Sequence, residues 1–259
     1  GADNTAVGKN ALKANISGGC NIAIGNGSLF TNTTGICNSA VGLDALFFNT
    51  TGDNNVAFGS LALCKNTTAD NNTSVGFKSL RANTTGTSNT AMGCGALTTN
   101  TTASNNTAVG HSSLTANTTG DKNTALGTGA LAANTTAGCN TAVGQASLCT
   151  NTTGCLNTAV GRQSLEVNLT GDNNTGLGYR ALNANTSADN NTAVGFCSLA
   201  ANTTGVQNTA VGVNSLIANT TGLNNSAFGC GALCRNTTAT NNVSISNVTS
   251  WNNSHLCSM

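Results

Sequence analysis

The sequence predicts an all-β protein, a parallel β-solenoid of the β-roll or β-helix kind with about fourteen coils of 17 residues. A 17-residue motif repeats without insertion or deletion from Asn4 to Asn241, and strict periodicity of this length is typical of repeat architectures. Each copy contains a short run such as Thr-Ala-Val, which favours β-structure. The chain has no proline, so nothing in it interrupts a backbone hydrogen-bond ladder.

We number the repeat from its first asparagine, so that positions 1 to 17 of one copy run from Asn106 to Lys122. Every complete copy has Asn at positions 1 and 12, Gly at position 5 and Leu at position 9. Positions 4 and 9 carry large apolar residues, and we expect both to fill the core of the coil. Positions 3 and 8 are small, which predicts close approach of another backbone. Positions 6, 7 and 10 vary freely, which predicts a solvent-facing side.

The segment from position 5 to position 12, G-x-x-A-L-x-x-N, allows one helical turn in each coil. A helical repeat is disfavoured because Asn, Thr and Gly form helices poorly, and 17 residues are too few for a pair of helices. One coil buries two large apolar side chains, each contributing roughly 1.5–3 kcal/mol. That amount does not offset the entropy lost on ordering a coil, so the coils must stabilise one another by stacking.

The pattern divides the chain into a solenoid, residues 1–241, and a degenerate last coil with a C-terminal cap, residues 242–259. In that second part Ser246 replaces the repeat's glycine and Ser250 replaces its leucine. We expect Trp251, the only tryptophan, to cover the last coil. Gly1 occupies position 15 of a repeat, so we interpret the sequence as a segment of a longer protein.

Position 12 begins an N-x-S/T sequence in every complete copy, which is the acceptor pattern for N-glycosylation. The middle residue can lose its hydroxyl, as Ile16 and Leu169 do, but the residue after it is always Thr or Ser. This asymmetry predicts glycosylation, although an inward ladder of Asn and Thr side chains is the alternative. The predicted acceptors are Asn15, Asn32, Asn49, Asn66, Asn83, Asn100, Asn117, Asn134, Asn151, Asn168, Asn185, Asn202, Asn219 and Asn236. The asparagines of position 1 are assigned to structure, because only the copy with Ser74 completes a sequon there.

The chain has eleven cysteines, which favours an oxidising compartment. Equal positions of successive coils lie about 4.8 Å apart in a stack, within reach of a disulfide. Cys20 and Cys37 both occupy position 17 and form the best candidate pair. Cys139 and Cys155 lie one coil apart at positions 17 and 16 and form a weaker pair.

Composition argues against several classes of function. Charged residues make up 7% and aromatic residues 3% of the chain, so we expect no nucleic-acid partner and no membrane partner. No catalytic constellation is present, so an enzyme is not expected, and we expect no cofactor and no metal. Aspartates recur at position 16, for example Asp53 and Asp70, where we expect Asx turns and not a calcium loop.

The motif N-T-A-V-G-x-x-A/S-L resembles two groups of proteins. One comprises the head repeats of trimeric autotransporter adhesins, and the other comprises N-T-A-V-G-x-x-A-L repeats of bacterial and phage tail-fibre-like surface proteins. The resemblance spans nearly the whole chain and rests on this short motif. It implies a left-handed parallel β-roll, often trimeric, that is used in adhesion. The repeat here is longer than that of the adhesin heads, and no stalk, anchor or chaperone domain is visible.

We therefore expect a secreted, structural fibre protein: a β-solenoid rod with regularly spaced covalent N-glycans. Its expected partner is itself, in a head-to-tail filament or a homotrimer. One alternative is an unglycosylated adhesin or tail-fibre shaft, a binding module. Another is an ice-binding protein, which needs a flat and bare threonine face. A glycan on each sequon would cover its regular column of threonines and so prevent that function.

Overall fold

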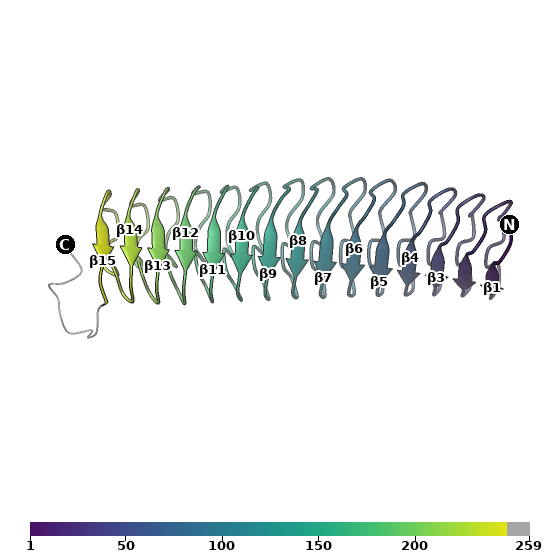
Figure 1. Cartoon of the computed structure of the whole chain (residues 1–259), viewed down its shortest axis with the longest axis horizontal. Coiled ribbons are helices and arrows are strands. Elements are labelled where there is room, and N and C mark those ends of the chain that lie inside the picture. The colour runs from purple at the N-terminus through teal and green to yellow at the C-terminus, as the bar shows by residue number, and fades with distance from the viewer. Residues whose placement is uncertain (248–259) are drawn as a thin grey trace. The chain divides into compact units, whose positions relative to one another are not determined.

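The computed structural model describes residues 1–247, which contain fifteen three-residue strands and no helix (Figure 1). The predicted fold, a parallel β-solenoid with a 17-residue coil, is confirmed. The strands are β1 (Thr5–Val7), β2 (Ile22–Ile24), β3 (Ser39–Val41), β4 (Val56–Phe58), β5 (Thr73–Val75), β6 (Thr90–Met92), β7 (Thr107–Val109), β8 (Thr124–Leu126), β9 (Thr141–Val143), β10 (Thr158–Val160), β11 (Thr175–Leu177), β12 (Thr192–Val194), β13 (Thr209–Val211), β14 (Ser226–Phe228) and β15 (Val243–Ile245). The predicted cap residue, Trp251, lies outside the described residues.

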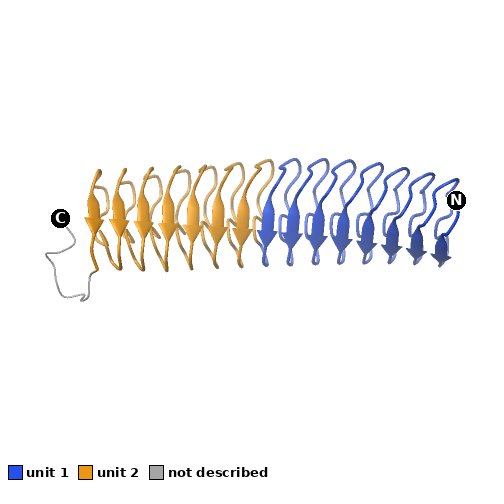
Figure 2. Ribbon diagram, in the orientation of Figure 1, with its two compact units in different colours: residues 1–129 blue, residues 130–259 orange. Residues whose placement is uncertain are grey.

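The chain forms two compact units, Gly1–Gly129 with β1 to β8 and Ala130–Met259 with β9 to β15 (Figure 2). Within each unit the strands pair in parallel and in chain order. The register places equal positions of the repeat side by side, as in Thr73 with Thr90 and Val75 with Met92. Each unit is therefore a regular stack in which a side chain of one coil meets the same position of the next.

Side chains of each strand alternate between the interior and the solvent. The residue at position 3, such as Ala91 or Ala108, is completely buried. The residues at positions 2 and 4 point outward, and Phe58 and Met92 at position 4 are 49% and 43% exposed. The prediction that position 4 fills the core is therefore wrong. Alternation along a strand sends positions 3 and 4 to opposite faces, and the small residue takes the inner one because the rest of the coil already fills the interior.

The core of each coil is built around the leucine of position 9, as predicted. Twelve of these leucines, from Leu29 to Leu216, are completely buried. Position 9 has a left-handed backbone, with φ of 47° at Leu80 and 50° at Leu97, and position 7 does too, with φ of 56° at Lys78. These two left-handed residues prevent the helical turn that the sequence allows, and the segment is a series of turns. A left-handed non-glycine residue costs about 1–2 kcal/mol, so stacking must stabilise each coil against this strain.

Replacing Ser112 by glycine should leave the stability of unit 1 unchanged or raise it by up to about 1.5 kcal/mol. Ser112 occupies position 7 with φ of 55°, and other coils have a glycine there, including Gly95 with φ of 70°. Relief of left-handed strain, about 1–2 kcal/mol, outweighs the flexibility that glycine adds to the unfolded chain, about 0.5–1 kcal/mol. The denaturant midpoint measures the change. A clear fall in the midpoint would show that the serine side chain has a structural role.

Candidate functional site

The asparagines of position 12 lie inside the coils. Twelve of the fourteen predicted glycan acceptors, from Asn32 to Asn219, are 0% exposed, and only Asn15 and Asn236 at the outer coils are half-buried. Asn83 shows the arrangement: its Nδ2 donates to Oδ1 of Asn66 in the preceding coil at 3.0 Å and to the carbonyl oxygen of Gly86 at 2.8 Å. Both hydrogens of this nitrogen are used, and both contacts lie in the interior. These asparagines form the inward ladder that the sequence left as the alternative.

A glycan on Nδ2 is incompatible with this folded coil, so the prediction of N-glycans at position 12 is corrected. The carbohydrate would replace one of the two donated hydrogens and would have to occupy the close-packed interior. At the outer coils the same nitrogen is bonded too: Asn15 donates to Gly18, and Asn236 donates to Asn219 and Ala239.

The asparagines of position 1 form a second inward column, as assigned from the sequence. Nδ2 of Asn38 donates to the carbonyl oxygen of Gly52 at 2.8 Å, and its Oδ1 accepts from the backbone N–H of Asn55 in the next coil at 2.9 Å. The same Gly52 oxygen accepts from Nδ2 of Asn49 at 2.9 Å. Two asparagine columns thus converge on one backbone carbonyl in such a coil. Asn106 is an exception, because its buried Nδ2 has no hydrogen-bond partner among the described residues. Buried polar groups that are fully bonded in this way specify a single register between coils.

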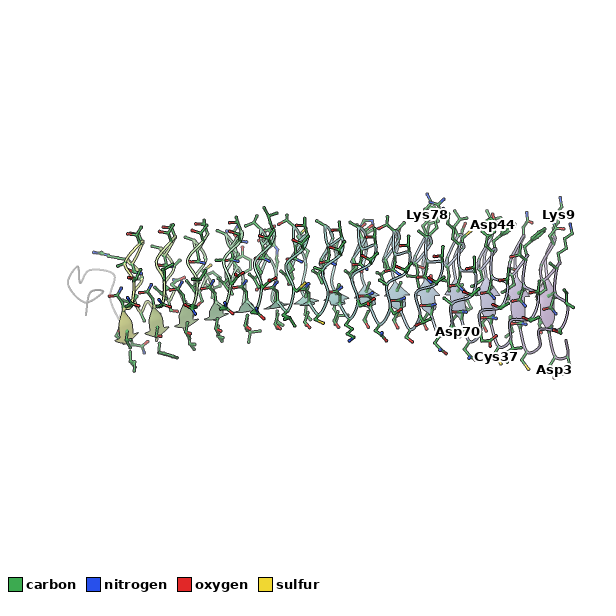
Figure 3. The ribbon with its side chains drawn as sticks, turned by 90° about the horizontal axis from the view of Figure 1, so that it is seen from above. Asp3, Lys9, Cys37, Asp44, Asp70 and Lys78 are labelled. Atoms are coloured by element: carbon green, nitrogen blue, oxygen red, sulfur yellow. The ribbon has the colours of Figure 1, made fainter. Side chains whose placement is uncertain are left out.

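Aspartates of position 16 bond between coils, which differs from the predicted Asx turns. Oδ1 of Asp70 accepts the backbone N–H of Asp53 in the preceding coil at 2.7 Å, and Asp189 does the same for Asp172 at 2.7 Å. Figure 3 shows Asp70 with Asp3 and Cys37 at one edge of unit 1 and Lys9, Asp44 and Lys78 at the opposite edge. Among the described residues no three His, Cys, Asp or Glu side chains come together in a way that could hold a metal ion.

Cys20, Cys37, Cys139 and Cys155 are free thiols, so neither predicted disulfide pair is formed. Cys20, Cys37 and Cys139 are exposed, and Cys155 is half-buried. Cys64 at position 10 is buried. Its burial, together with the nearby carboxylate of Asp44, raises the pKa of the Cys64 thiol.

Cys64 should react with a thiol-specific alkylating reagent at least about ten times more slowly than Cys20 or Cys37 at pH 8, because the thiolate is the nucleophile and Cys64 is both buried and less ionised. Peptide mass spectrometry after a timed reaction of the native protein measures the rates. The unfolded protein is the control, in which the three residues should react alike. Equal rates in the native protein would contradict the burial of Cys64.

The side chains of positions 2 and 4 make a continuous outer strand face in each unit. In unit 2, each strand from β9 to β13 has Thr at position 2 and Val or Leu at position 4. In unit 1 the strands β5 to β8 repeat the pattern with Val, Met or Leu. None of these residues is charged. Sequence reasoning missed this face because it placed position 4 in the core, although the alternation of a three-residue strand could have revealed it.

Two columns of threonine residues are exposed or half-exposed: position 2, which is part of this face, and position 14, which lies in the bend after the asparagine of position 12. In the described part of the chain, the hydroxyls of position 2, as in Thr107 and Thr158, have no hydrogen-bond partner within the protein, nor do those of position 14, as in Thr85. Position 13 differs, since Oγ1 of Thr84 donates to the carbonyl oxygen of Thr101 at 3.0 Å. The two columns of unbonded threonine hydroxyls are therefore positions 2 and 14. The threonine hydroxyls of position 13 join neighbouring coils.

No protein-family model, curated protein or solved structure matches this chain. Across the described residues, no helix has the length and apolar character needed to cross a membrane.

Proposed function

We propose that this chain is a structural shaft of an extracellular fibre or adhesin, and that copies of it associate through the outer strand face. Of the two fibre hypotheses raised by the sequence, the unglycosylated shaft is favoured, because the position-12 asparagines are internal. The proposal is supported chiefly by one observation: each unit exposes an uncharged column of apolar side chains on its strands, including Val7 and Phe58 in unit 1 and Phe228 in unit 2. Contiguous exposed apolar surface is typical of interaction sites.

The repeat favours a second copy of the same chain as the partner. The outer strand face places its side chains at the spacing of paired strands, about 4.8 Å, and equal positions recur at every coil. A partner surface with the same period can contact this face at every coil. A surface without that period can contact it at only a few coils. Self-association of identical faces also follows the usual symmetry of homo-oligomers.

Replacing Phe58 by lysine should weaken self-association at least about tenfold, because a buried charge without a partner costs several kcal/mol. Phe58 is 49% exposed at position 4, and Phe77 is 48% exposed at position 6, off the outer strand face. Phe77→Lys is thus the matched control and should associate like the parent. Sedimentation equilibrium of the three proteins measures association, and thermal unfolding confirms that each is folded. A monomeric parent, or equal loss in both variants, would overturn this assembly.

Ice binding is the second candidate, because the unbonded hydroxyls of position 2 supply the bare threonine column that this function needs. Five successive strands of unit 2, from Thr141 to Val211, combine such a threonine with Val or Leu and contain no charge. The test is inhibition of ice recrystallisation by the purified protein. A protein that stays monomeric and inhibits ice growth favours this candidate, and one that associates without affecting ice favours the shaft.

A further inference from the structure

We infer that the position-12 sequons are sites where N-glycan transfer blocks folding, so that this protein must fold out of reach of N-glycan transfer. In that reaction Nδ2 of the asparagine bonds to the anomeric carbon of a lipid-diphosphate-linked oligosaccharide. The bond from this carbon to the diphosphate oxygen breaks, the lipid diphosphate leaves, and Nδ2 loses one proton. No oxidation or reduction occurs. The acceptor must be accessible to the transferase, and the twelve asparagines from Asn32 to Asn219 are accessible only in the unfolded chain.

The coil has no space for the product. A single carbon atom added to Gly35 would lie 2.6 Å from Oδ1 of Asn32 and 3.0 Å from Nδ2 of Asn49. A methyl group beside the ladder already requires its neighbours to shift, and a sugar ring attached to the ladder nitrogen is far larger. The glycan would also remove a hydrogen that Nδ2 donates, either to the preceding coil or to the carbonyl of position 15. The modified coil therefore cannot stack on the coils beside it.

The hydroxyl that completes each sequon is separate from the core. The residue at position 14, such as Thr85, is exposed. In the described residues its hydroxyl has no partner within the protein. Valine at this position keeps the branched shape and removes the sequon, because the acceptor pattern needs Ser or Thr at its third place. The sequons can thus be abolished without altering the asparagine ladder.

The chain also provides sequons on its surface. Asn105 occupies position 17, is exposed, and begins the sequence Asn-Asn-Thr that ends at Thr107. Its backbone N–H donates to the carbonyl oxygen of Thr87 at 3.0 Å, and the structure shows no hydrogen bond from its side chain. A glycan on Asn105 would project into solvent and leave its coil intact. Asn83 and Asn105 are therefore a buried and an exposed acceptor in the same unit.

This inference goes beyond the proposed shaft function. It rests on that function only where it concerns the route by which the protein leaves the cell. If the protein acts outside the cell, it reaches that place without exposing an unfolded chain to a lipid-linked oligosaccharide. The inference itself rests on the burial and bonding of position 12. It holds or fails whatever partner the outer strand face has.

The experiment uses a variant in which the Ser or Thr that completes every sequon is replaced by Val or Ala. The variant is expressed through a secretory pathway that performs N-glycosylation. Two derivatives restore one sequon each: one keeps Thr85, with the buried acceptor Asn83, and one keeps Thr107, with the exposed acceptor Asn105. The full-length parent is expressed in the same pathway. The parent gene expressed in a bacterial cytosol provides the unglycosylated reference for folding and for the self-association test. Mass spectrometry locates the glycans, and limited proteolysis of the secreted protein reports folding.

The sequon-free protein and the Asn105 derivative should be secreted and should resist protease. Molecules of the Asn83 derivative that carry a glycan should be retained or cleaved near that coil, with at least about a tenfold loss of folded product. The parent should accumulate as a heavily glycosylated species that does not fold. A protease-resistant protein glycosylated at Asn83 would overturn the inference. So would equal loss of the two single-sequon derivatives, because it would show that the position of the acceptor is immaterial. Neither result would bear on self-association of the bacterial protein.

Discussion

Replacing Gly93 by alanine is expected to destabilise unit 1 by more than about 3 kcal/mol, an effect reserved for severe backbone or packing conflicts. Gly93 is position 5, with φ of +134°, a conformation that residues with a side chain rarely adopt. A Cβ atom there would lie 2.6 Å from the carbonyl oxygen of Gly110 and 2.7 Å from its carbonyl carbon. Both atoms belong to the backbone of the next coil, so neither can rotate away.

Gly95, two residues further along the same coil, is the matched control. Its φ is also positive, at 70°, but the atom nearest to an added Cβ would be Thr98 Oγ1, at 3.5 Å. Gly95→Ala should cost the left-handed strain, about 1–2 kcal/mol, less the roughly 0.5–1 kcal/mol gained because alanine restricts the unfolded chain. Urea denaturation followed by circular dichroism compares the two variants with the parent. Equal losses would show that contact between coils at position 5 is not the cause.

Replacing Asn83 by aspartate should destabilise the protein by about 3–5 kcal/mol at pH 7, because it removes two donated hydrogen bonds and buries a charge without a partner. The new carboxylate would face Oδ1 of Asn66 and the carbonyl oxygen of Gly86, which are both acceptors. Asn71→Asp is the control at exposed position 17, where the change should cost less than about 0.5 kcal/mol.

The effect of Asn83→Asp should depend on pH in a defined direction. Burial raises the pKa of a carboxyl group in the folded protein above its unfolded value of about 4. The folded state then binds a proton more readily than the unfolded state, so the loss is largest above the raised pKa. It shrinks as the pH falls between the two pKa values. Denaturation midpoints of parent and variant at pH 7 and pH 4.5 test this. A gap that widened on acidification would contradict burial of the side chain.

The sequence alone predicted much of the fold because the repeat restricts each position. A stack places every residue beside its own counterpart, so a position fixed as Gly or Leu shows what all coils require. An invariant glycine at position 5 indicates a place where no side chain fits, and Gly93 has both a positive φ and close contact with the next coil. The leucine of position 9 was predicted to be in the core and is buried throughout the central coils. Parallel pairing agrees with the strict 17-residue repeat, because the strands of successive copies run in the same direction.

The direction of individual side chains was harder to predict. Val109 and Leu114 are equally apolar, yet the first is half-exposed and the second is buried. Hydrophobicity cannot distinguish them, because the inner place on the strand is already occupied by the small residue Ala108. Likewise, a sequon gives no information about which side of the chain its asparagine faces. The deciding contacts are the two hydrogen bonds that Nδ2 of Asn83 donates, one to a backbone carbonyl in its own coil and one to Asn66 in the preceding coil. The second forms only after stacking.

Hydrogen exchange of the asparagine side-chain amides, followed by nuclear magnetic resonance, tests most directly whether two asparagine columns hold the coils together from inside. The Nδ2 hydrogens of Asn66, Asn83 and Asn38 are donated to buried acceptors and should exchange slowly. Those of Asn71 and Asn105, exposed at position 17, should exchange within the dead time of the measurement. Rapid exchange at Asn66 and Asn83 would place position 12 at the surface, return the glycan-coated fibre to consideration, and contradict the account of the core.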